Sequence, residues 1–270
     1  LVYARKHSER YLRIFKDHLY IKGYVDDTTE IIKKLKELSS TGISGYSDFV
    51  ESWLSKNPSY RIDSKEKLTA LKTIFSDSHV VLIYGSAGTG KSTLINHISN
   101  LYNDRKKKYL ANTNPAVDNM RRKVNAGNCD FKTITKILSN YNTVTECDIL
   151  FIDECSTVSN KDMRDILEKA TFKLLVLVGD VFQIEAILFG NWFNVARTFV
   201  PETSVSELSR PYRSTNTRLL TIWDRVRNLQ DDILEPMVKG KYTVKLDESI
   251  FEHSDEDEII LCLNYDGLYG

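Results

Sequence analysis

The chain has 270 residues, of which 41% are hydrophobic and 27% are charged, and its formal net charge is zero. This length exceeds a single domain of about 100–200 residues, so we expect one full α/β domain with appended pieces. No segment approaches the roughly 18 consecutive apolar residues of a membrane helix, which argues against a membrane partner. The four cysteines show no CxxC pairing. They favour reduced thiols in a cytoplasmic protein over a disulfide framework or a zinc site.

Residues 1–60 are predicted to form a helical N-terminal region. Apolar residues recur at helical spacing over 11–19, 31–38 and 46–54, and an Asp27-x-x-Glu30 capping pattern precedes the second group. No chemistry is visible in these segments. They are a candidate surface for a protein partner or, alternatively, the end of a larger upstream domain.

From residue 61 to 207, apolar strands alternate with amphipathic helices. We expect strands over 79–84, 107–112, 148–152 and 173–178, and helices over 91–102, 115–124 and 161–169. Such alternation predicts a parallel sheet with helices on both faces. Ligands of these sheets bind beyond the carboxyl ends of the strands, so motifs at those ends can meet in space. Residues 208–270 contain a predicted helix over 215–229 and predicted strands near 241–246 and 258–263.

A glycine-rich segment follows the first of these strands and has the phosphate-binding P-loop pattern, Gly85-Ser86-Ala87-Gly88-Thr89-Gly90-Lys91-Ser92-Thr93. Its glycines allow successive backbone N–H groups to surround a phosphate, and the helix that opens near Lys91 adds its positive end. Lys91 is the candidate for the β- and γ-phosphates of ATP, and Ser92 is a candidate ligand of Mg²⁺. The pattern therefore predicts nucleotide binding rather than a purely structural loop.

Two adjacent carboxylates, Asp153 and Glu154, end the strand predicted over 148–152. In a nucleotide site, Asp153 would bind Mg²⁺ directly or through water, and Glu154 would polarise the water that attacks the γ-phosphate. The alternative is an acidic turn after a strand. The P-loop upstream favours the nucleotide interpretation.

The last predicted strand ends in the segment GDVFQ, residues 179–183. Gly179 permits a sharp exit from the strand, and Asp180 and Gln183 place a carboxylate and an amide at the same edge of the sheet. These two residues are candidates for reading the γ-phosphate and transmitting its loss. A plain Asx turn explains the Gly-Asp pair equally well.

Three segments, GSAGTGKST, FIDECS and GDVFQ, resemble in order and spacing motifs I, II and III of superfamily 1 helicases. The resemblance is closest to the RecD-like and Pif1-like branch, SF1B, also called the exonuclease V alpha subunit type, and covers roughly residues 62–270. It implies an ATP-dependent helicase or translocase that moves on single-stranded DNA, with RNA as the alternative. It also implies that 61–207 is a RecA-like P-loop domain and that 208–270 is a linker helix and the beginning of a second one.

Three further segments carry the same resemblance. Thr113 and Asn114 stand in a segment similar to motif Ia, and Thr133 in one similar to motif Ib, which implies contacts to nucleic acid phosphates. Without the family, Thr113 and Asn114 are a polar turn and a helix N-cap. The segment ELSRPYRS resembles motif IV, which implies that Arg213 is an arginine finger, with Arg210 as the second candidate.

The chain departs from the family upstream of the P-loop. These enzymes usually carry a Gln there that reads adenine, and residues 64–67 contain none, with Lys67 nearest its place. Two other functions stay open. One is a regulatory or sensor ATPase whose nucleotide state controls partner binding. The other, a small-molecule P-loop kinase, is disfavoured because it would need a lid and would leave GDVFQ and YRS without a role.

Overall fold

The computed structural model describes residues 12–139, 144–183, 186, 189–210, 212, 214 and 216–243. The chain divides into two compact units, Leu1–Arg213 and Ser214–Gly270. In the described part of the second unit, α10 (Thr217–Arg227) confirms the helix predicted over 215–229, and α11 (Leu234–Lys239) follows it. Of the two strands predicted there, residues 241–243 form a turn without a strand, and the remainder lies outside the described residues.

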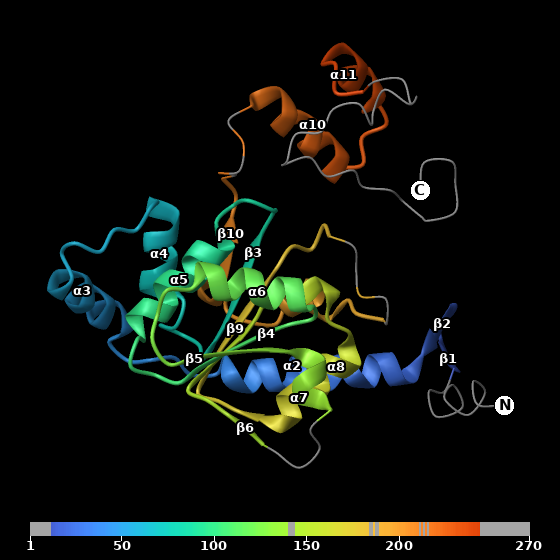
Figure 1. The fold of residues 1–270 in the computed structure, drawn as a ribbon. Helices are drawn as coiled ribbons and strands as arrows, with labels where there is room; N and C mark the ends of the chain where they lie inside the picture. The colour runs from blue at the N-terminus through green and yellow to red at the C-terminus, as the bar shows by residue number, and fades with distance from the viewer. Residues whose placement is uncertain are drawn as a thin grey trace. The chain divides into compact units, whose positions relative to one another are not determined.

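A six-stranded parallel sheet forms the centre of the first unit, in the order β10-β3-β9-β7-β4-β5 (Figure 1). Its strands are β3 (Val80–Gly85), β4 (Lys107–Ala111), β5 (Cys129–Thr133), β7 (Ile149–Ile152), β9 (Leu174–Gly179) and β10 (Val205–Leu208). All of its strand pairs are parallel. This sheet confirms the predicted α/β fold class. The two strands missed by the prediction, β5 and β10, are the edge strands, whose apolar content is lower.

Helices cover both faces of the sheet (Figure 1). They are α2 (Lys22–Leu38), α3 (Tyr46–Lys56), α4 (Lys65–Thr73), α5 (Lys91–Leu101), α6 (Asn114–Lys123), α7 (Ile134–Leu138), α8 (Asn160–Lys169) and α9 (Trp192–Ala196). Alternate strand residues face opposite sides: Val81 and Val176 pack with α3, α4, α5 and α6. Val80 and Leu175 pack with α2, α7, α8 and α9. No helix among the described residues is both long and apolar enough to span a membrane.

Short elements connect these layers. They are the paired strands β6 (Thr145–Glu146) and β8 (Ala170–Thr171) and the 3-10 helices η1 (Cys155–Thr157) and η2 (Glu202–Ser204). The P-loop strand β3 lies inside the sheet, between β9 and β10. Every residue of β3 is buried. The loop that follows this strand is therefore anchored by a rigid element.

The helix predicted over residues 11–19 is wrong, because a β-hairpin occupies most of this segment. Strands β1 (Leu12–Phe15) and β2 (His18–Ile21) pair antiparallel, with Leu12 opposite Ile21 and Ile14 opposite Leu19. The apolar residues fit a period of two as well as a helical period, and cross-strand pairs of such residues stabilise a hairpin. Helix α2 then begins at Lys22, ahead of the predicted capping pattern.

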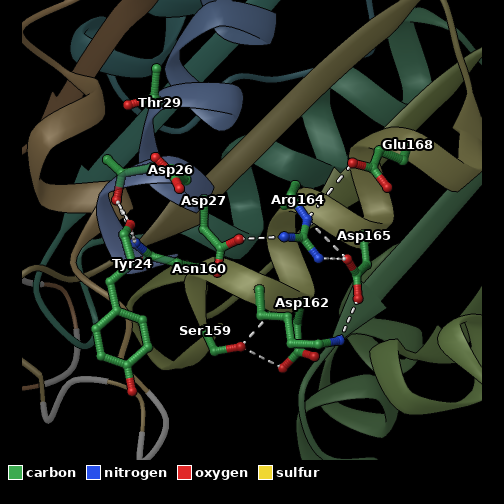
Figure 2. Close-up of polar contacts among 12 residues, drawn as sticks. Tyr24, Asp26, Asp27, Thr29, Ser159, Asn160, Asp162, Arg164, Asp165 and Glu168 are labelled. Atoms are coloured by element: carbon green, nitrogen blue, oxygen red, sulfur yellow. Dashed lines mark hydrogen bonds and ion pairs between the residues drawn. The ribbon is translucent and has the colours of Figure 1, made fainter. Parts of the chain in front are cut away.

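A polar cluster joins α2 to α8 (Figure 2). Asp27, only 4% exposed, forms an ion pair with Arg164, whose guanidinium also bonds Asp165 at 2.7 Å. Asn160, which is fully buried, donates to the Thr28 hydroxyl at 2.5 Å. Burial of charged groups is costly unless they are paired, so these contacts fix how α2 lies on the sheet domain. Asp27 does not cap the helix, because α2 already begins at Lys22.

We expect the substitution Asp27→Ala to lower the free energy of unfolding by about 1–2 kcal/mol, measured by urea denaturation. This is less than the roughly 3–5 kcal/mol of a broken buried pair, because Arg164 keeps Asp165 as a partner. The control is Asp26→Ala, which removes an exposed pair with Lys22 and should change stability by less than about 0.5 kcal/mol. Equal effects of the two substitutions would contradict this account of the α2–α8 contact.

Candidate nucleotide-binding site

The P-loop lies between β3 and α5 and has the backbone that its glycines predict. Gly88 and Gly90 have φ angles of 84° and 89°, in the region that favours glycine. Helix α5 begins directly after Gly90, which offers no side chain to cap it. Thr89 is buried and its hydroxyl donates to the Ser86 carbonyl at 2.9 Å. The loop is thus a preformed turn that leads into the positive end of a helix.

The remaining P-loop residues surround this turn. Ala87 is exposed, whereas Ser92 and Thr93 are half-buried in the first turn of α5. The Lys91 ammonium donates to the carbonyl oxygens of Gly85 at 2.6 Å and Ser86 at 3.1 Å. The lysine side chain therefore folds back over its own loop.

The two carboxylates follow β7 as predicted. Asp153 is 9% exposed, and its backbone N–H donates to the Leu110 carbonyl of β4 at 2.9 Å. Its side chain accepts a hydrogen bond from the Glu154 N–H at 2.8 Å. Glu154 has a φ of 53°, a left-handed conformation that is uncommon for a residue other than glycine. Such strained residues cluster at functional sites, because the surrounding structure must hold them.

Burial raises the pKa of Asp153 above its usual value, while the Glu154 N–H and the positive charge of Lys91 act in the opposite direction. Burial, followed by the negative charge of Asp153, raises the pKa of Glu154, and Lys91 again opposes the shift. Lys91 is thus the cation that both carboxylates share. The structure brings the predicted P-loop lysine and the predicted acidic pair into one electrostatic unit.

The GDVFQ segment leaves β9 at the same edge of the sheet. Asp180 is 5% exposed, and its carboxylate accepts the Phe182 N–H at 3.1 Å in an Asx-type turn. Gln183 is exposed, and its backbone N–H donates to the Asp180 carbonyl at 3.2 Å. A Cβ at Gly179 would collide with the Phe193 ring. The glycine is therefore required by packing, and the turn directs Gln183 toward solvent.

The residues predicted to contact nucleic acid follow β4 and β5, which are the last two strands in the order of the sheet. Thr113 caps α6 by accepting the Ala116 N–H at 3.3 Å, and Asn114 begins that helix with an exposed side chain. Thr133 caps α7 by accepting the Lys136 N–H at 3.3 Å. Both threonines thus serve as N-caps, and neighbouring parallel strands deliver them to the same edge.

The motif IV-like segment is partly described. Arg213 lies outside the described residues. Arg210 is exposed, with its guanidinium 5.5 Å from the centre of the Tyr212 ring. The Tyr212 N–H donates to the Gly88 carbonyl at 2.8 Å, so this segment touches the P-loop directly.

One group of side chains beside the P-loop has no predicted role. Lys67 is fully buried, and it contacts Gly90 and the ring of Tyr212. Asp63 and His97 complete the group. The sequence offers no periodic pattern that joins these positions, which lie on three separate segments. The only signal is a lysine in a position where the family implies a glutamine.

The residues present fit a magnesium–nucleotide complex. A carboxylate and a hydroxyl, from Asp153 and Ser92, are oxygen ligands of the kind that Mg²⁺ prefers. Mg²⁺ typically retains several waters and phosphate oxygens, so few protein ligands are needed. The described residues contain no cluster of three or more His, Cys, Asp or Glu side chains suited to a metal ion.

The family model described as an AAA domain matches residues 64–235, more than half of the chain. No curated protein sequence matches the chain. Among solved structures, the Pif1 helicase from Candida albicans is 22% identical with a TM-score of 0.47, covering 70% of this chain and 50% of that one. Bacteroides Pif1 bound to ssDNA is 17% identical with a TM-score of 0.46, covering 67% and 50%. The chain thus spans about half the length of the solved structures it matches.

Because burial raises the pKa of Asp153 in the folded state, its ionised form destabilises the fold. This penalty is absent below the unfolded-state pKa, near the ordinary aspartate value of 3.8, and is complete above the folded-state pKa. We therefore expect Asp153→Asn to raise the melting temperature at pH 7 in the absence of Mg²⁺, and the gain to vanish as the pH falls toward 4. Thermal unfolding across this pH range measures the effect.

Asp148→Asn is the control, because the pKa of Asp148 is shifted in the opposite direction to that of Asp153. Hydrogen bonds from Lys173 and the Lys106 N–H lower the pKa of Asp148. Its ionised form therefore stabilises the fold, and the substitution should lower the melting temperature at pH 7. A loss of stability at pH 7 in Asp153→Asn would contradict the account of a buried carboxylate whose charge is only partly compensated.

Proposed function

The chain belongs to the AAA domain family, in its RecD-like and Pif1-like form, and from this premise we propose that it is the ATP-hydrolysing motor part of a DNA helicase or translocase. The observation that carries the proposal is the shared position of Lys91, Asp153 and Glu154 at one edge of the sheet. A phosphate loop and an acidic pair, joined by one lysine, suit the hydrolysis of a nucleoside triphosphate.

In this proposal, the P-loop from Gly85 to Thr93 binds the phosphates of ATP, and Lys91 turns from its own carbonyls to the β- and γ-phosphates. Ser92 and Asp153 hold Mg²⁺, which neutralises charge on the phosphate oxygens when it is bound. Glu154 accepts a proton from the attacking water, and its raised pKa brings it nearer to the pH at which a general base works best. The products are ADP and inorganic phosphate.

Residues that follow the neighbouring β-strands would couple ATP hydrolysis to movement on nucleic acid. Gln183 and Asp180 read the γ-phosphate, and Arg213 supplies positive charge to the transferring phosphoryl group. Thr113, Asn114 and Thr133 contact the phosphates of single-stranded DNA, with RNA as the alternative. Bacteroides Pif1, which is similar in part, has been solved in complex with ADP-AlF3 and ssDNA. Closing of the site around ATP and reopening after hydrolysis would then move the protein along the single-stranded nucleic acid.

A regulatory ATPase is the second candidate, and one observation favours it. The hairpin β1–β2 exposes apolar side chains, with Leu12 at 59%, Ile14 at 75% and Leu19 at 63%. Leu12 and Ile14 share one face of the hairpin with their partners Ile21 and Leu19. Exposed apolar clusters of this kind suit contact with a protein. Stimulation of ATP hydrolysis by ssDNA separates the two candidates, because only the motor requires it.

We expect Glu154→Gln to retain ATP binding and to lower the rate of ATP hydrolysis by about 10²–10⁴-fold, the usual contribution of a general base. Lys91→Ala should lower both binding and hydrolysis. Release of inorganic phosphate measures the rate, and equilibrium titration with ATP measures the affinity. The control is Glu146→Gln, an exposed carboxylate on β6 that should leave both unchanged. Undiminished hydrolysis in Glu154→Gln would exclude its proposed role.

Thr113→Ala should abolish stimulation of hydrolysis by ssDNA and leave the basal rate unchanged. The loss of an N-cap also costs about 1 kcal/mol of stability, so a matched variant is needed. Ser159→Ala provides it, because Ser159 caps α8 by accepting the Asp162 N–H at 3.1 Å. If both variants keep full stimulation, Thr113 takes no part in strand binding.

A further inference from the structure

Lys67 of α4 is a fully buried lysine beside the P-loop. Lysine is among the residues least often buried, and an ammonium inside a protein needs a compensating partner. Asp63, four residues earlier and just ahead of α4, forms an ion pair with it. The ring centre of Tyr212 lies 4.5 Å from the ammonium nitrogen and adds a cation–π contact.

The ammonium of Lys67 lies directly against Gly90. A Cβ at Gly90 would collide with Nζ and with the adjoining carbon, and the next nearest atom belongs to Tyr212 at 3.8 Å. No Asp63 atom is as close to this position. The ion pair is therefore a dipole with its positive end toward the P-loop. Gly90 is also the residue that precedes the first turn of α5.

A chain of hydrogen bonds holds Asp63 in place. His97 Nε2 donates to the second carboxylate oxygen at 3.1 Å, and His97 Nδ1 accepts the Tyr60 hydroxyl at 2.8 Å. Burial lowers the pKa of His97, so the ring is neutral near pH 7 and carries one proton. Since His97 belongs to α5, the network connects α4 to the helix that follows the P-loop.

The network is expensive as a purely structural device. Lys67 is fully buried, while the side chain of its partner Asp63 is 42% exposed, and even fully buried ion pairs can often be replaced by apolar residues of similar volume at no loss of stability. Stability alone therefore does not explain the positive charge of Lys67. Its ammonium lies against the phosphate-binding loop, which points to a role in that loop. We propose that Lys67 is a positioning residue for the polyphosphate of the nucleotide: its ammonium holds the backbone at Gly90 and adds positive potential to the phosphate site. This inference rests on the proposed nucleotide binding.

The test is equilibrium titration of the full chain with ATP and with inorganic tripolyphosphate, which has no base or sugar, at fixed Mg²⁺ and ionic strength. We expect Lys67→Met to weaken both ligands by about tenfold, the effect of one partly screened charge. The double variant Asp63→Asn/Lys67→Met removes both charges and leaves no unpaired carboxylate. It should stay equally weakened. Lys72→Met, on the same helix and paired with Glu51, should bind as the wild type does.

Three results would overturn the inference alone. Wild-type affinity in the double variant would mean that Lys67 only neutralises Asp63. Weakened ATP binding with unchanged tripolyphosphate binding would place Lys67 at the nucleoside. Unchanged binding of both ligands in Lys67→Met would remove its role, while the proposed function would survive. If the wild-type chain binds neither ligand, the proposed function itself fails, and the inference with it.

Discussion

The arrangement of this molecule depends on the parallel pairing of β3, β9, β7 and β4 at the centre of the sheet. Parallel strands end at the same edge, so each loop that follows them emerges beside the next. Tyr84 pairs with Gly179, and Ile152 with Leu177, which aligns the carboxyl ends of β3, β9 and β7. The P-loop, the acidic pair and GDVFQ therefore meet although up to about a hundred residues separate them.

The central strands are buried on both faces, and this burial sets the electrostatic environment of the carboxylates that follow them. Asp153 follows a strand with no exposed residue, and it has little access to water. An ionised carboxylate there is unfavourable without a cation, and Lys91 partly compensates it. Glu154 follows Asp153 with a left-handed backbone conformation. A bound divalent cation would offset the cost of burying the negative charges of Asp153 and Glu154. The electrostatics of the two carboxylates therefore support the proposed metal site.

Much of this could be predicted from the sequence. The apolar runs of β3, β4, β7 and β9 are unambiguous because these strands are buried, and the AAA domain match confirms the RecD-like and Pif1-like resemblance. The hairpin at 12–21 could not be predicted, since its apolar spacing fits two periods. The edge strands β5 and β10 have too few apolar residues to stand out. The roles of Thr113 and Arg213 stay predictions: Thr113 is an N-cap, and Arg213 lies outside the described residues.

The contacts of Lys67 escaped prediction for a different reason. Apart from the i,i+4 pair with Asp63, they join segments far apart in the chain, which carry Lys67, Gly90 and Tyr212, and no local pattern encodes such contacts. A buried lysine looks like any exposed lysine when only the sequence is read. Its burial, its ion pair and its contact with the P-loop come from the tertiary structure alone.

The central claim is that the P-loop and the acidic pair form one site for Mg²⁺ and a nucleoside triphosphate. The most direct measurement is a crystal structure of the chain with Mg²⁺ and a non-hydrolysable ATP analogue. We expect the Lys91 ammonium to leave the carbonyls of Gly85 and Ser86 for the phosphates, and the metal to lie between Ser92 and Asp153. A nucleotide bound elsewhere, or a metal bound without Asp153, would contradict the account.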